Sequence, residues 1–106
     1  LRFPITAADI RPVGEKLIAD LGAYAEQAGW ADAPDNREGI RISFPAGDGD
    51  GWFLLRMSVH DPILPLNLES NVAGGVRVLA EKLLTFLQQA DTDSVDYTSL
   101  REFLNA

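Results

Sequence analysis

The pattern of apolar and polar positions predicts strands and helices in a definite order along the chain. Residues 1–6 form a short apolar run with a proline, which is typical of an edge strand. After Asp9, which can cap a helix, apolar residues recur at spacings of three and four up to Gly29. The stripe of this predicted amphipathic helix consists of Val13, Leu17, Leu21, Tyr24 and Ala28.

The middle of the chain has the two-residue period of half-buried strands. Residues 31–39 collect Pro, Asn, Asp and Gly in the manner of a surface loop, and residues 40–44 then alternate between apolar and polar. The segment PAGDGDG, residues 45–51, predicts a turn that leads into the second arm of a hairpin at residues 52–59. Residues 63–70 alternate again. The side of this strand that we expect to meet the core carries Leu64, Leu66 and Leu68.

The last third of the chain predicts two further helices. One runs from about residue 73 to residue 90, and a short one follows within residues 97–106. The apolar stripe of the longer helix consists of Val76, Leu79, Leu83, Phe86 and Leu87. The order β-α-β-β-β-α predicts a single α+β domain over residues 1–106, with a four-stranded antiparallel sheet that two main helices cover on one face.

Composition narrows the classes of function. The 106 residues carry nine Lys and Arg against sixteen Asp and Glu, and the net charge of −7 opposes binding to nucleic acid or to anionic lipid. The absence of cysteine excludes disulfides and zinc-thiolate sites, and a single histidine excludes a histidine cluster. No apolar run is long enough to span a bilayer, so we expect a cytoplasmic protein without a membrane partner. Because the chain begins at Leu1 within an apparent strand, we expect it to be a piece of a longer protein.

Several conspicuous segments have a structural interpretation. The segment GDGDG, residues 47–51, lacks the length and the closing glutamate of a calcium loop and is better explained as a hairpin turn. The pair Gly74 and Gly75 opens a helix, where backbone amides can hold an anion, but no strand with the fingerprint of a dinucleotide site precedes it. Trp30 and Trp52 are single aromatics that suit packing, and the acidic segment DTDSVD suits a solvated loop.

The segment RMSVHDP, residues 56–62, concentrates chemistry that is rare in this chain. Arg56 offers a planar fork of donors for a phosphate, Ser58 adds a hydroxyl, and His60 is the only histidine. A loop between two strands can also turn successive backbone amides toward one anion. From these residues alone, a phosphate-binding loop and an ordinary connection between strands both stay open.

A resemblance to a known family favours the phosphate-binding interpretation. Together with REGIRISF upstream and LPLNLES downstream, Arg56, Ser58, Asp61 and Pro62 resemble the C-terminal domain of the alpha-D-phosphohexomutases, the family of phosphomannomutase and phosphoglucomutase. That family carries an R-x-S-[GN]-T-E-P loop between two strands, after a D-G-[LIV] strand start and before a strand of the form R-L-N-V-E-S. The match is nearly gapless over residues 38–70, and the flanking elements fit the order of that domain.

The resemblance implies a fold, a role and a set of site residues. The family domain is an α+β unit similar to the TATA-box-binding-protein fold, and its loop binds the phosphate of the hexose phosphate that is not transferred. By position, the substrate phosphate would be bound by Arg56, Ser58, Val59 and His60. The phosphoserine nucleophile and the Mg²⁺ site of the family lie in other domains of the same chain. The fragment would therefore hold no catalytic residue, metal or cofactor of its own.

Three positions depart from the family pattern. Val59 stands where the family has glycine or asparagine, His60 replaces a threonine that donates its hydroxyl, and Pro65 replaces a basic residue. Asp61 replaces a glutamate conservatively. Hydrogen bonds to a charged group each contribute roughly 1.5 to 3 kcal/mol, so these losses weaken phosphate binding unless His60 replaces a donor. His60 as a third donor and His60 as a surface residue without a ligand both stay open.

Two functions follow as hypotheses. The first is a substrate-phosphate-binding domain of an enzyme of the isomerase class that moves a phosphoryl group between the 1- and 6-positions of a hexose. The second is a degenerate, non-catalytic domain that serves packing or oligomerisation in a divergent mutase-like protein. The residues that select glucose or mannose lie outside this domain in the family, so the sequence does not indicate the sugar.

Overall fold

The fold is α+β, as the sequence predicts, and its elements follow the expected order. The computed structural model describes residues 1–32, 39–58 and 61–105. The strands are β1 (Arg2–Pro4), β2 (Ala31–Asp32), β3 (Gly39–Phe44), β4 (Gly51–Arg56) and β5 (Ile63–Ser70), and the helices are α1 (Ile10–Ala28), α2 (Gly75–Gln89) and α3 (Thr98–Asn105). The sheet is antiparallel throughout, in the order β1-β5-β4-β3-β2.

The four predicted strands are present, and the two-residue strand β2 extends the sheet beyond β3. The composition of residues 31–39 predicts a surface loop, so strand β2 at Ala31–Asp32 is a difference from the prediction. The predicted second hairpin arm also extends to residue 59, whereas β4 ends at Arg56. The N–H of Ser58 still donates to the carbonyl of Ile63, its partner in the β4–β5 register, and the chain turns away beyond it, where the N–H of Asp61 donates to the Ser58 hydroxyl oxygen.

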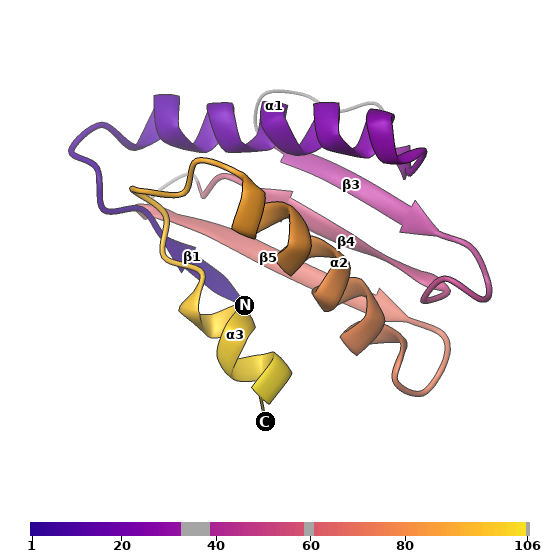
Figure 1. Ribbon diagram of the computed structural model, residues 1–106. Helices are drawn as coiled ribbons and strands as arrows, with labels where there is room; N and C mark the ends of the chain where they lie inside the picture. The colour runs from indigo at the N-terminus through magenta and orange to yellow at the C-terminus, as the bar shows by residue number, and fades with distance from the viewer. Residues whose placement is uncertain (33–38, 59–60, 106) are drawn as a thin grey trace.

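The helices cover one face of the sheet and leave the other face uncovered (Figure 1). Along β3 and β4, buried side chains alternate with exposed or half-buried ones, so every second residue contacts the helical layer. The strand residues fully removed from solvent on the covered side include Ile42, Phe53, Leu55 and Leu64. On β5, Leu64 and Leu66 are buried and Leu68 is half-buried, which confirms the predicted orientation of this strand.

Helix α1 follows its predicted bounds closely. It ends at Gly29, whose φ of 75° and bonds to the carbonyls of Ala25 and Glu26 form a left-handed C-cap. Asp9 occupies the predicted N-cap position, but its side chain makes no hydrogen bond to the backbone of the first turn. The buried stripe of α1 differs from the predicted one at its C-terminal end, because Ala25 is buried and the predicted Ala28 is exposed.

Helices α2 and α3 complete the layer that covers the sheet. The predicted stripe of α2 is buried apart from Val76, which is half-buried, and α3 buries Leu100 and Leu104 beside α2 and β1. The side chain of Asp96 accepts hydrogen bonds from the backbone N–H and the hydroxyl of Thr98, at 2.9 and 2.5 Å. These bonds lower the pKa of Asp96 from its ordinary value. Asp96, in the exposed acidic segment before α3, thus binds the first residue of that helix.

Candidate functional site

The connection from β4 to β5 is the loop that the sequence analysis singled out. Arg56, the last residue of β4, is exposed and pairs with Gly39 of β3 in the sheet register. Among residues 1–32, 39–58 and 61–105, no carboxylate forms an ion pair with Arg56. In a chain with a net charge of −7, a guanidinium that has no ion pair with a described carboxylate can bind an external anion.

Hydrogen bonds fix the base of this loop. The N–H of Ser58 donates to the carbonyl of Ile63 at 3.3 Å, and the Ser58 hydroxyl oxygen accepts a bond from the N–H of Asp61 at 3.3 Å. The N–H of Ile63 donates to the carbonyl of Asp61 at 2.8 Å. The carbonyl of Pro62 in turn accepts a 2.7 Å bond from the N–H of Ile5. These bonds connect the loop to the start of β5 and to Ile5, the residue that follows β1.

The first half of the loop also packs against α1. A Cβ added at Gly14 would lie 3.1 Å from Sδ and Cε of Met57, so the Met57 side chain rests on the helix backbone at this glycine. Met57 is half-buried and belongs to the rim of the core. This contact places Arg56 and Ser58 on either side of a residue that packs against α1.

The structure brings two of the four predicted phosphate ligands together at one end of the sheet. Arg56 and Ser58 are separated only by the anchored Met57. Val59 and His60 lie outside the described residues. Asp61 and Pro62 are exposed, and both take part in the hydrogen bonds that close the loop. The exposed guanidinium of Arg56 can supply donors to a phosphate at the molecular surface.

The other segments considered at the sequence level have structural roles. Residues 47–51 lie at the end of the β3–β4 hairpin, where Asp48 and Asp50 donate their N–H groups to the carbonyl of Pro45, so the predicted hairpin turn is confirmed. Gly75 is buried at the start of α2, where a Cβ would collide with the Ser70 side chain. Among the described residues, no group of three or more His, Cys, Asp or Glu could hold a metal ion.

The two tryptophans have different surroundings. Trp30 packs edge-on against Tyr24 and Phe44, with ring centroids 5.2 Å apart in both pairs, which confirms the packing role predicted for it. Trp52 lies on the uncovered face of the sheet and is half-buried. The guanidinium carbon of Arg41 lies 4.3 Å from the centroid of the Trp52 ring, a cation–π contact that the sequence analysis did not predict.

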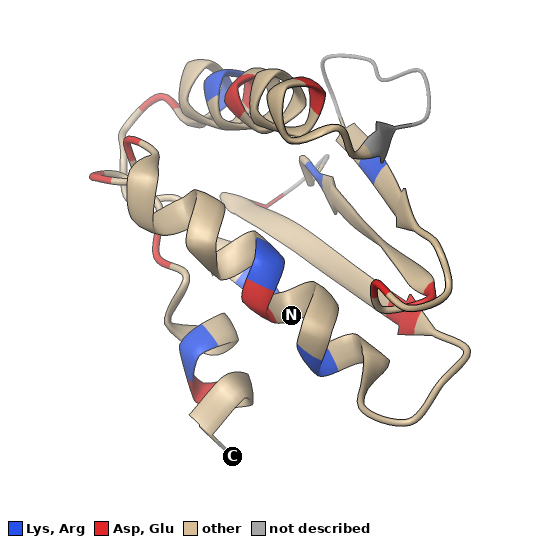
Figure 2. Ribbon diagram, turned by 45° about the vertical axis from the view of Figure 1, so that its right-hand side comes forward, with Lys and Arg blue, Asp and Glu red and all other residues tan. Residues whose placement is uncertain are grey.

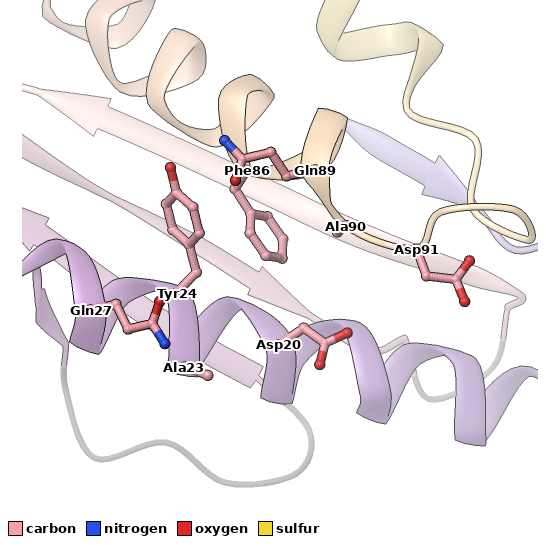
Figure 3. A pocket seen from close by; sticks show the side chains of 8 residues that line it. All are labelled: Asp20, Ala23, Tyr24, Gln27, Phe86, Gln89, Ala90 and Asp91. Carbon is pink, nitrogen blue, oxygen red and sulfur yellow. The ribbon is translucent and has the colours of Figure 1, made fainter.

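A cavity of about 340 Å³ lies between α1 and α2. Figure 3 shows the Tyr24 and Phe86 rings side by side within it, with the carboxylates of Asp20 and Asp91 at its edge. The ammonium of Lys16 donates to Asp20 at 2.7 Å, and this bond is the main cause of the raised pKa of Lys16. Because carboxylates repel phosphate, this cavity does not compete with the β4–β5 loop for an anionic ligand.

Comparisons with protein-family models, with curated proteins and with solved structures found no match to this chain. No helix within the described ranges is both long and apolar enough to cross a membrane. The likeness to the TATA-box-binding-protein fold and to the phosphohexomutases stays a prediction from the motif around the loop.

Proposed function

We propose that this chain is the C-terminal domain of an alpha-D-phosphohexomutase and that its β4–β5 loop binds the phosphate that is not transferred. The observation that carries the proposal is Arg56, which is exposed, has no ion pair among the described residues, and ends β4 where the loop with the family's R-x-S spacing begins. Ser58 is the second contact, and His60 is a third donor by sequence position. The β-strand before the loop and the contact of Met57 with α1 support a preformed site.

Within the proposed enzyme this domain positions the substrate. The full protein would interconvert hexose 1-phosphate and hexose 6-phosphate, with Mg²⁺ and the phosphoserine held by other domains of the same chain. The sugar would be bound at both ends, so the distal phosphate on Arg56 fixes which oxygen meets the reacting phosphoryl group. A movable domain that binds one phosphate can also close the cleft and exclude water.

The proposal predicts where a phosphosugar binds on this chain. In a titration of the 106-residue protein with glucose 1-phosphate, followed by the backbone amide signals in ¹H–¹⁵N spectra, the largest shifts are expected at residues 56–61. Inorganic phosphate is expected to shift the same amides, because the phosphate makes the contacts. Glucose serves as the matched control and is expected to leave these signals in place.

The alternative function, a degenerate packing or oligomerisation domain, is favoured by the family departures at Val59, His60 and Pro65. Pro65 is half-buried in β5, where it pairs with Arg2 and offers no charge to a ligand. Under this alternative, both phosphate compounds leave the loop amides unchanged at the highest soluble concentration. That result would overturn the proposed phosphate site, and sedimentation of the same sample would then show whether the chain self-associates.

A further inference from the structure

The positively charged side chains among the described residues fall into two groups by position. Four cations of the helical layer pair with acids, and these pairs are Arg11 with Glu15, Lys16 with Asp20, Arg77 with Glu81, and Lys82 with Asp48. Arg101 donates to the hydroxyl of Tyr97 at 3.0 Å. Figure 2 shows basic segments beside acidic ones on α1 and α2, and further basic segments on the strands of the sheet.

The remaining described arginines are Arg2, Arg41 and Arg56, and none of them forms an ion pair with a described residue. All three are exposed and alternate with buried neighbours on their strands. Each therefore points away from the helices. The arginines without acidic partners are thus gathered on the uncovered face of the sheet.

The sheet register places these three arginines near one another. Arg2 of β1 pairs with Pro65 of β5. On the other edge of β5, Leu55 of β4 pairs with Leu66, so the next residue of β4, Arg56, lies opposite Pro65. Arg2 and Arg56 are then two strands apart, about 10 Å between backbones. Arg41 is two residues from Gly39, the partner of Arg56, and this diagonal spacing is about 7 to 8 Å. The three side chains span the sheet from β1 to β3.

Apolar side chains surround this basic row. Trp52, Leu54, Ile63 and Pro65 are half-buried on the same face, because no helix covers them. Leu54 lies directly between Arg41 of β3 and Asn67 of β5, and Arg41 rests on Trp52. A surface with arginine, tryptophan and aliphatic side chains has the composition of a protein–protein interface centre.

We propose that the uncovered sheet face, defined by Arg2, Arg41, Trp52, Leu54 and Arg56, binds an acidic protein segment. Carboxylates are the complementary charge, and arginine forks bind them in a bidentate manner. Among the described residues of this face, three arginines stand against one acid, Glu69. This balance of +2 contrasts with the net charge of −7 of the whole chain. A membrane or a nucleic acid extends beyond this face and is repelled by the net negative charge of the rest of the chain. A short acidic segment contacts the face alone.

The test uses hexaglutamate as the probe and the 106-residue protein as it is. Amide shifts are expected on β3, β4 and β5. Arg41→Gln is expected to weaken binding about fivefold, the upper range for an exposed charge pair. The matched control Arg77→Gln removes the same charge from the helical layer and is expected to leave the affinity unchanged. Arg41 lies outside the β4–β5 loop, so this outcome is independent of phosphate binding.

Three results would overturn the proposal. One is an equal loss of hexaglutamate affinity in the Arg41→Gln and Arg77→Gln variants, which would indicate a general charge effect. Another is a set of amide shifts confined to residues 56–62. The third is binding to phosphatidylserine vesicles in the absence of binding to hexaglutamate, which would assign the face to a lipid surface.

Discussion

Replacement of Phe53 by alanine is expected to lower the free energy of unfolding by about 3 to 5 kcal/mol. Phe53 lies on β4 with no exposed surface and packs against Phe44 at a ring-centroid distance of 5.6 Å and against Trp30 at 6.4 Å. Its loss removes apolar burial and leaves a cavity that the strands on both sides keep open, because β3 and β5 are each hydrogen-bonded to β4. Urea unfolding followed by far-UV circular dichroism measures the change.

The matched control is Phe103→Ala on α3. Phe103 is 38% exposed, so the same truncation removes much less buried surface and is expected to cost under about 1 kcal/mol. A loss in Phe53→Ala no larger than that in Phe103→Ala would mean that the core does not lie between the helical layer and this part of β4.

Substitution of Gly75 by alanine is expected to cost about 3 kcal/mol, at the upper end for an overpacked site. A Cβ at this position would collide with the Ser70 hydroxyl and lie 2.5 Å from the carbonyl oxygen of Gly49. The Ser70 hydroxyl donates to that same carbonyl at 2.5 Å and accepts from the N–H of Val72 at 3.2 Å. The contact therefore joins the start of α2, the end of β5 and the hairpin turn, and none of them can withdraw alone.

Gly74→Ala provides the comparison for this site. Gly74 has a φ of 77° but nothing within 4 Å of an added Cβ, so alanine there suffers only backbone strain, about 1 to 2 kcal/mol. Thermal unfolding of the two variants is expected to rank Gly75→Ala as the less stable. If Gly74→Ala were the less stable variant, the close packing described at the start of α2 would be wrong, and the helix would begin loosely at the glycine pair.

Local sequence patterns predicted most of this fold because the strands and helices carry one buried face each. The alternation in residues 40–44 and 63–70 matches the burial of β3 and β5. Gly29 ended α1 as expected, since only its left-handed conformation closes the helix in that way. Strand β2 escaped prediction because two residues give no periodicity, and its pairing to Ser43 and Ile42 depends on the backbone.

The candidate site was predictable in part. The spacing of Arg56 and Ser58 came from the sequence, whereas the absence of an acidic partner for Arg56 among the described residues required the three-dimensional contacts. The grouping of Arg2 and Arg41 with Arg56 was missed. Each of these arginines stands next to a core residue on its strand, so the alternation along the sequence indicates that it points away from the core. Only the register across β1, β5, β4 and β3 shows that the three arginines lie near one another.

The affinity of an Arg56→Gln variant for glucose 1-phosphate tests the central claim most directly. The loss of a charged hydrogen-bonding group worth roughly 1.5 to 3 kcal/mol predicts an affinity at least about tenfold lower than in the unchanged protein. Arg77→Gln, which removes an equal charge from α2, is the control and is expected to bind as the unchanged protein does. Equal affinities of the Arg56→Gln variant and the unchanged protein would contradict the assignment of the β4–β5 loop as a phosphate site.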